Sequence, residues 1–147
     1  MQDSTIGRFC LLKLDEMIVV VGGLDDRTAN TVPDFAGANS AYQLLLHTLG
    51  MLRQWTQSAI LGRAIERDRE AEFTAVGEVG ELIEYAGTVR AEFVAALGEM
   101  HPDLDVPGRE GFDDFWATST EGILIHVFEE ICQHLGHLEI TRDLVSR

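Results

Sequence analysis

The chain has 147 residues and a formal net charge of −14, from 25 acidic and 11 basic residues. A chain of this length can bury about 70% of its unfolded surface, so we expect one domain over residues 1–147 that needs no disulfide or structural metal. The acidic excess, without any basic cluster, argues against nucleic acid or an anionic membrane as a partner and is compatible with a cation as ligand.

The amino-terminal sequence MQDSTIGRFC lacks the basic and apolar segments of a secretory signal. The longest apolar run, MIVVV, is far shorter than the roughly 20 residues of a membrane span. Cys10 and Cys132 form no Cys-x-x-Cys motif, which favours a reduced, cytoplasmic protein over a disulfide framework. We expect both cysteines to lie in the core.

The first half of the chain predicts two long helices. Apolar residues recur at three- and four-residue spacing over residues 4–22, and MIVVV lies inside that helical period. After a turn-rich segment, Ser40 and Gln43 have the spacing of a capping box and predict a second helix over residues 40–60. Residues 61–75 are charged and show no sustained apolar period.

The second half predicts two more helices. Helical spacing of apolar residues returns over residues 79–97. Thr118 and Glu121 form a second candidate capping box, which predicts a last helix running to about Val145. Four long amphipathic helices without a convincing strand predict an all-α protein with an antiparallel four-helix bundle.

The last predicted helix carries a stripe of potential metal ligands. At 100° per residue, three histidines lie within about 40° of Glu130 on one face, beside the apolar face that a bundle can cover. These are His126, His134 and His137. A Glu and a His four residues apart are one helical turn apart, and a third ligand from another helix would complete a site with an open position.

His47 is the obvious third ligand because it is the histidine of the second helix and follows the apolar pair Leu45 and Leu46. A di-iron bundle would need Glu-x-x-His motifs, which the chain lacks, so a site for one metal ion remains. The alternative is that each histidine is only a hydrogen-bonded helix residue. His101 precedes a proline, so we expect it in a loop.

The long connection over residues 99–117 holds three aromatic residues, Phe112, Phe115 and Trp116. They are too apolar for a free linker. Two interpretations stay open: these side chains pack on the bundle, or they cover the open end of the site.

Two stretches carry a resemblance to a known family. GANSAYQLLLHTLGMLRQW, which contains His47, and LIHVFEEICQHLGHLEITRDL, which contains Glu130 and His134, resemble the DinB superfamily, and within it the group related to mycothiol-dependent maleylpyruvate isomerase. The resemblance implies an up-down-down-up bundle of the DinB/YfiT-like kind, a homodimer, and a divalent metal, usually zinc or nickel, held by His47, Glu130 and His134.

The resemblance also implies an activity. It predicts a divalent-metal-dependent enzyme that uses a small-molecule thiol such as mycothiol, and an electrophilic substrate, for S-transfer or thiol-assisted isomerisation. His126 and His137 would orient ligands or move protons. Arg90 and Arg142 would either hold a carboxylate or form ordinary salt bridges. The alternatives are a non-catalytic metal-binding or interaction bundle and a metal-dependent hydrolase.

Overall fold

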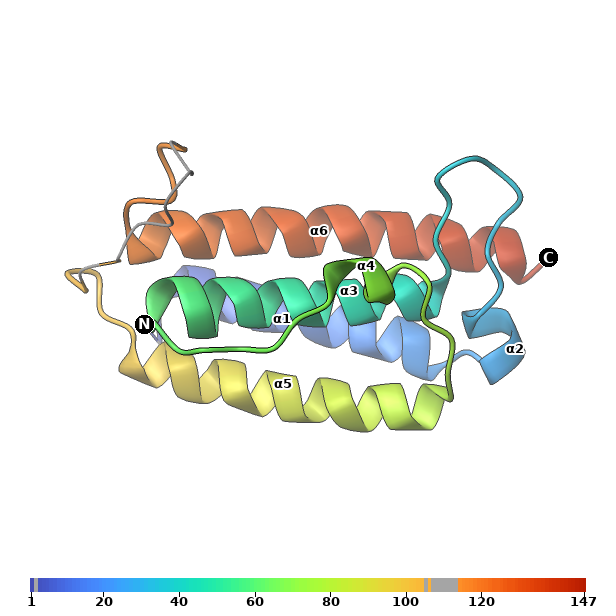
Figure 1. Ribbon diagram of the computed structural model, residues 1–147, viewed down its shortest axis with the longest axis horizontal. Coiled ribbons are helices and arrows are strands. Elements are labelled where there is room, and N and C mark those ends of the chain that lie inside the picture. Colours follow the sequence, from blue (N-terminus) through green and yellow to red (C-terminus); the bar gives the residue numbers. More distant parts are fainter. Residues whose placement is uncertain (2, 105, 107–113) are drawn as a thin grey trace.

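The computed structural model describes residues 1–147 apart from residues 2, 105 and 107–113. Within the described residues all regular structure is helical, which confirms the all-α prediction (Figure 1). The elements are α1 (Thr5–Gly22), α2 (Asp26–Ala29), α3 (Ala41–Arg53), the π-helix η1 (Gln54–Ile60), α4 (Arg69–Glu72), α5 (Val79–Glu99) and α6 (Thr120–Val145).

The four long helices form the predicted up-down-down-up bundle. In Figure 1, α1 and α6 run in one direction while α3 and α5 run in the other. α1 and α3 each pack against both α5 and α6. Because α3 and α5 are parallel, residues 61–78 must return along the length of the bundle, and α4 lies within this crossover and packs on α3.

Side-chain caps explain where the helices of the site begin. The Ser40 side chain accepts a hydrogen bond from the backbone N–H of Gln43, and the Gln43 side chain accepts one from the backbone N–H of Ser40. The predicted capping box is therefore confirmed. The second predicted box is wrong by one residue. The backbone turns into α6 after Ser119, whose hydroxyl accepts from the N–H of Gly122, while the Thr118 hydroxyl donates to the Phe115 carbonyl instead.

The core runs along the axis of the bundle and takes large side chains from every long helix. Leu14, Leu45, Phe93 and Ile131 are examples with 0 to 1% of their surface exposed. Cys10 belongs to this core, as expected, but Cys132 is only half-buried, so its predicted core position is wrong. No helix in the described part of the chain is both long enough and apolar enough to cross a bilayer.

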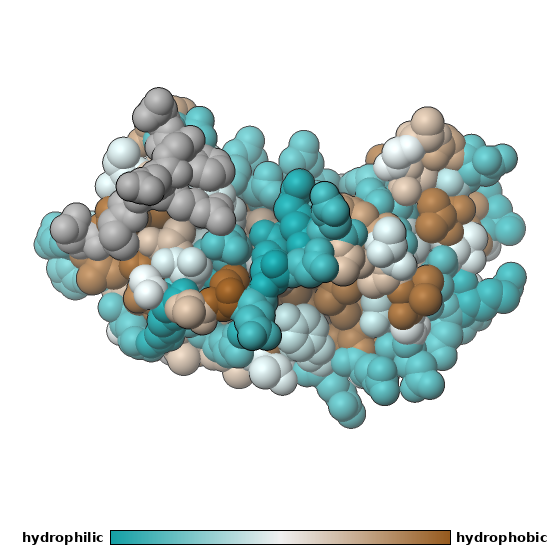
Figure 2. All heavy atoms as spheres, viewed as in Figure 1, coloured by the Kyte–Doolittle hydropathy of each residue, from teal (hydrophilic) through white to brown (hydrophobic). Residues whose placement is uncertain are grey.

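The crossover is polar on its outer side. Figure 2 shows hydrophilic side chains gathered over the middle of the face on which Figure 1 shows this connection, with hydrophobic residues to either side. Residues 61–75 are charged and have no apolar period, as a segment on the surface of the bundle should. Its short helix α4 packs on α3 and contributes the buried Glu72.

Candidate metal centre

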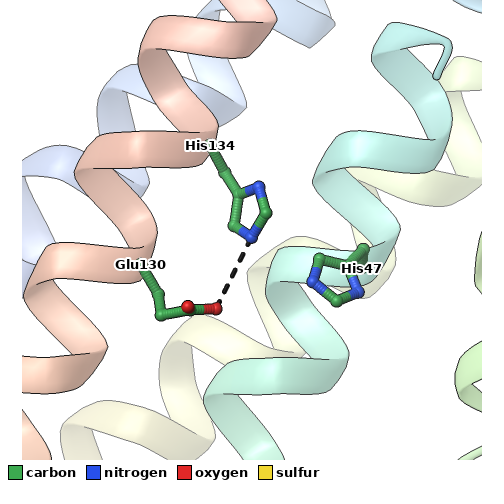
Figure 3. A group of neighbouring side chains, drawn as sticks. All are labelled: His47, Glu130 and His134. Carbon is green, nitrogen blue, oxygen red and sulfur yellow. Dashed lines mark ion pairs between the residues drawn. The ribbon is translucent and has the colours of Figure 1, made fainter. Parts of the chain in front are cut away.

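The structure brings His47, Glu130 and His134 together from two helices. His47 lies in the middle of α3 and is buried, with 4% of its surface exposed. Glu130 and His134 lie one turn apart on α6 and are half-buried, and His134 Nε2 is 3.6 Å from Glu130 Oε2. Figure 3 shows the three side chains turned toward one another across the gap between α3 and α6.

These three residues fit a divalent metal ion. One potential ligand atom from each lies within 4.8 Å of the other two. Ligands of a tetrahedral zinc ion lie about 3.3 to 3.5 Å apart, and the 3.6 Å between the Glu130 and His134 atoms is close to this spacing. Two imidazoles and one carboxylate are also a ligand set that zinc accepts, with one coordination position left open.

Burial and neighbouring groups lower the pKa values of two of the three residues, His47 and Glu130. Burial lowers the pKa of His47 below its ordinary value of 6.5, His134 lowers it further, and Glu72 opposes the shift. The pKa of Glu130 is lowered from its ordinary value of 4.5 by the adjacent His134, against the effect of burial. Metal ions bind neutral imidazole and ionised carboxylate, so both shifts reduce competition from protons.

Behind His47 the structure places three residues that the sequence did not single out. Glu72 of α4 is buried, and its Oε2 lies 3.2 Å from His47 Nδ1. Arg67 of the crossover donates to the same carboxylate through Nε, at 2.6 Å. Phe73 stacks beside the His47 ring, with centroids 4.7 Å apart. The charged composition of residues 61–75 hid this contribution, because nothing in the pattern distinguishes the inward-facing Glu72 from its exposed acidic neighbours.

A pocket of about 360 Å³ opens beside the three residues. His47 and Glu130 form part of its wall, so a small molecule in the pocket would lie next to a metal ion held by these residues. The rest of the lining consists of polar, apolar and aromatic side chains: Met51, Gln54, Trp55, Arg67, Arg69 and His126. Gln54 and Trp55 belong to η1, and π-helical turns are rare structures that occur frequently at functional sites.

The remaining candidate histidines lie outside the three-residue group. His126 is half-buried and lines the pocket; its Nδ1 has no hydrogen-bond partner among the described residues, and Glu129 Oε2 is 3.5 Å away. His137 is half-buried further along α6, beyond the group. His101 is exposed in the connection after α5, as expected.

The two arginines considered as carboxylate binders form salt bridges within the chain. Arg90 pairs with Asp15 on α1 at 2.6 Å, and Arg142 pairs with Asp143, its neighbour in sequence, at 2.9 Å. Neither lines the pocket beside the metal centre. The structure therefore favours the salt-bridge alternative for both.

The connection before α6 places Trp116 against the bundle. Its ring stacks on His126 with centroids 3.7 Å apart, and its edge meets Trp55 at 5.1 Å. Gly122 of α6 makes this possible, because a Cβ there would collide with the Trp116 carbonyl. Phe115 is 91% exposed, and Phe112 lies outside the described residues. Trp116 thus packs on the bundle at the side of the pocket.

The fold and the three converging residues define a helical bundle of the DinB kind with a candidate metal centre. The model of the family described as mycothiol-S-transferase matches residues 13–146, and the chain belongs to this family. Among solved structures, a conserved protein from Enterococcus faecalis is similar in fold, with a TM-score of 0.67 over 95% of this chain and 94% of that chain. The two sequences are 17% identical, so this likeness shows the fold alone. No curated protein matches the chain.

Proposed function

We propose that the protein is a divalent-metal-dependent enzyme that joins the sulfur of mycothiol to an electrophilic small molecule. The observation that carries the proposal is the convergence of His47, Glu130 and His134 beside an open pocket. Membership of the mycothiol-S-transferase family supports mycothiol as the thiol. Zinc and nickel are the metals that we propose for the centre, and we place the protein in the cytoplasm as a homodimer.

When bound, a divalent ion would supply the positive charge that ionises a thiol, whose pKa is otherwise near ~8.5. The protein supplies the rest of the site. His47, Glu130 and His134 leave one side of the centre open toward the pocket, where Trp55 and Met51 offer apolar surface and Gln54 offers polar groups to a substrate. The guanidinium group of Arg69 favours substrates or leaving groups with negative charge.

The proposed transfer balances as a substitution. The thiol loses its proton, a bond forms between sulfur and the electrophilic carbon, and the bond to the leaving group breaks with its electron pair. His126 is the candidate to accept the thiol proton, because it lines the pocket. In thiol-assisted isomerisation the same sulfur would add to the substrate and then depart.

Metal-loaded protein should catalyse transfer from mycothiol to an aryl halide, and omission of the thiol should abolish turnover. Cobalt-substituted protein should also develop a sulfur-to-cobalt charge-transfer band when mycothiol is added, with cysteine and glutathione as comparison thiols. Turnover of ester substrates by water alone would favour the hydrolase. Full metal occupancy without a thiol-dependent band or any turnover would favour a non-catalytic bundle.

A further inference from the structure

Glu72 is an unusual residue for its position. Glu72 has 6% of its surface exposed, and no other Asp or Glu among the described residues is buried. It nevertheless belongs to a short helix in a hydrophilic crossover. Removing a carboxylate from water is strongly unfavourable unless hydrogen bonds and an opposite charge compensate. Its partners therefore indicate why it is there.

Those partners are the proposed metal ligand His47 and an arginine. Arg67 binds the carboxylate with two groups, Nε to Oε1 at 2.6 Å and one terminal nitrogen to Oε2 at 3.1 Å. His47 Nδ1 lies 3.2 Å from Oε2. The same terminal nitrogen of Arg67 is 3.5 Å from His47 Nδ1, but arginine can only donate. An ionised carboxylate can only accept, so a hydrogen on His47 Nδ1 would be donated to Glu72 Oε2, the nearer of the two groups.

Gly50 makes room for this arrangement. It lies on α3 three residues after His47, on the same side of the helix. A Cβ at this position would lie 2.8 Å from Glu72 Oε1 and 2.9 Å from Arg67 Nε. Glycine destabilises the interior of a helix relative to alanine, and here its missing side chain leaves room for the close approach of the Glu72–Arg67 pair.

We propose that Glu72 is a positioning residue for the metal centre, a role that rests on the proposed function. By accepting the Nδ1 hydrogen of His47, it holds the ring in the tautomer whose Nε2 lone pair is available to a metal. It also fixes the orientation in which one ring nitrogen faces Glu130 and His134, as Figure 3 shows. Arg67 holds the carboxylate in place, and Gly50 lets the pair approach α3. Histidines that bind metals commonly donate their other N–H to a carboxylate in this way.

The test measures metal affinity directly, by competition between the full-length protein and a chromogenic chelator for zinc. Glu72→Ala should weaken zinc binding by about 10- to 100-fold, the usual effect of losing such a partner. Glu72→Gln, which preserves the shape, covers the case in which the alanine variant does not fold, and it should weaken binding by about 10-fold, the low end of that effect. Glu66→Gln removes a charge from an exposed residue of the same crossover and should leave affinity unchanged.

Gly50→Ala supplies an independent measurement because it displaces the pair without removing its charge. It should weaken zinc binding as well, and the double variant Gly50→Ala/Glu72→Ala should be no weaker than the worse single variant, because both changes break one contact. In the metal-free protein with nitrogen-15-labelled histidine, NMR should show the Nδ1–H tautomer of His47, and Glu72→Gln should reduce its population.

Wild-type affinity in folded Glu72→Gln and Glu72→Ala would overturn the positioning role. So would fully additive effects in the double variant. His47→Ala separates this failure from failure of the proposed function. If His47→Ala loses zinc while the Glu72 variants keep it, only the positioning role is wrong. If His47→Ala also keeps wild-type affinity, the metal centre itself is wrong, and the positioning role falls with it.

Discussion

The two walls of the candidate metal centre differ in how they are built. Glu130 and His134 come from α6, a long helix packed against α1 and α3, so the bundle core fixes their direction. Glu72 and Arg67 come from the crossover, whose only regular structure in the described chain is the short helix α4. The first wall, on α6, offers potential ligand atoms to a metal. The second wall, in the crossover, contacts His47 through the Glu72 carboxylate.

The two regions should therefore affect different properties: α6 the stability of the fold, and the crossover the binding of a metal. Side chains of α6 such as Ile131 are fully buried and contribute to folding whether or not a metal binds. The crossover buries little apolar surface, so the main structural contribution of Glu72 is to one histidine ring. Changes in the two regions should therefore be distinguishable by measuring metal affinity and unfolding free energy separately.

The largest effect should follow from removing a ligand. His134→Ala should weaken metal binding by more than the roughly 10- to 100-fold typical of a supporting residue, because it removes a donor atom itself. Far-UV circular dichroism should stay helical, since His134 is only half-buried. Elemental analysis of the purified protein measures the loss.

His137→Ala is the matched control, because this histidine shares the helix but lies outside the three-residue group. It should retain the metal. Equal metal content in both variants would show that the ligand assignment on α6 is wrong.

Core substitution should give the largest effect on stability. Ile131 is fully buried on α6, next to Glu130 in sequence, so Ile131→Ala should lower the unfolding free energy by about 2 to 5 kcal/mol. Val76 of the crossover is 73% exposed, so Val76→Ala should change it by less than about 0.5 kcal/mol. Urea titration of the metal-free proteins measures both. A destabilisation by Val76→Ala comparable to that of Ile131→Ala would contradict the contrast between the two regions.

The sequence predicted the first wall better than the second for a physical reason. Helical periodicity converts spacing into direction, so the shared face of Glu130 and His134 followed from their four-residue separation. A lone histidine on the neighbouring helix then suggested His47. Periodicity also failed at one helix start, where Thr118 and Ser119 can both cap and only the backbone path selects Ser119.

The crossover has no period, so the direction of each acidic side chain depends on the tertiary path of the segment. Glu72 could not be told from its exposed neighbour Glu70. The one available indication was Gly50, a glycine inside a predicted helix and three residues after a candidate ligand. Such a glycine permits a close approach by another part of the chain but does not establish one, since Gly87 and Gly136 also lie inside helices and a Cβ at either would meet nothing within 4 Å.

Acidification should destabilise the protein through His47, which lies between the two walls and has a lowered pKa in the folded state. Its pKa is lower in the folded protein than its ordinary value of 6.5, so the unfolded chain takes up the proton more readily. The contribution of His47 to stability is therefore complete above the unfolded pKa and is lost as the pH falls toward the folded pKa. We expect the unfolding free energy of the metal-free protein to decline as the pH is lowered below about 6.5.

Urea titrations between about pH 8 and pH 5 measure this decline, and His47→Gln isolates the contribution of the ring. The variant should show a shallower decline than the wild type over the same interval. An identical slope in the two proteins would mean that His47 has the same pKa in the folded and unfolded states.

The smallest effect should come from the cap of α4. The Asp68 side chain accepts a hydrogen bond from the backbone N–H of Ala71 at 3.1 Å, and loss of such a cap costs about 1 kcal/mol of local helix stability. Fraying of α4 would withdraw Glu72 from His47 part of the time, and about 1 kcal/mol corresponds to at most a roughly 5-fold loss of apparent metal affinity.

Asp68→Ala should thus weaken zinc binding by about 2- to 5-fold while the global unfolding free energy stays within about 1 kcal/mol of the wild type. Asp68→Asn removes the same charge but keeps a good capping group, so it should bind zinc like the wild type. Equal weakening by both variants would mean that the charge of Asp68, rather than the order of α4, supports the metal, and the crossover would then act through its electrostatic field instead of through the position of Glu72.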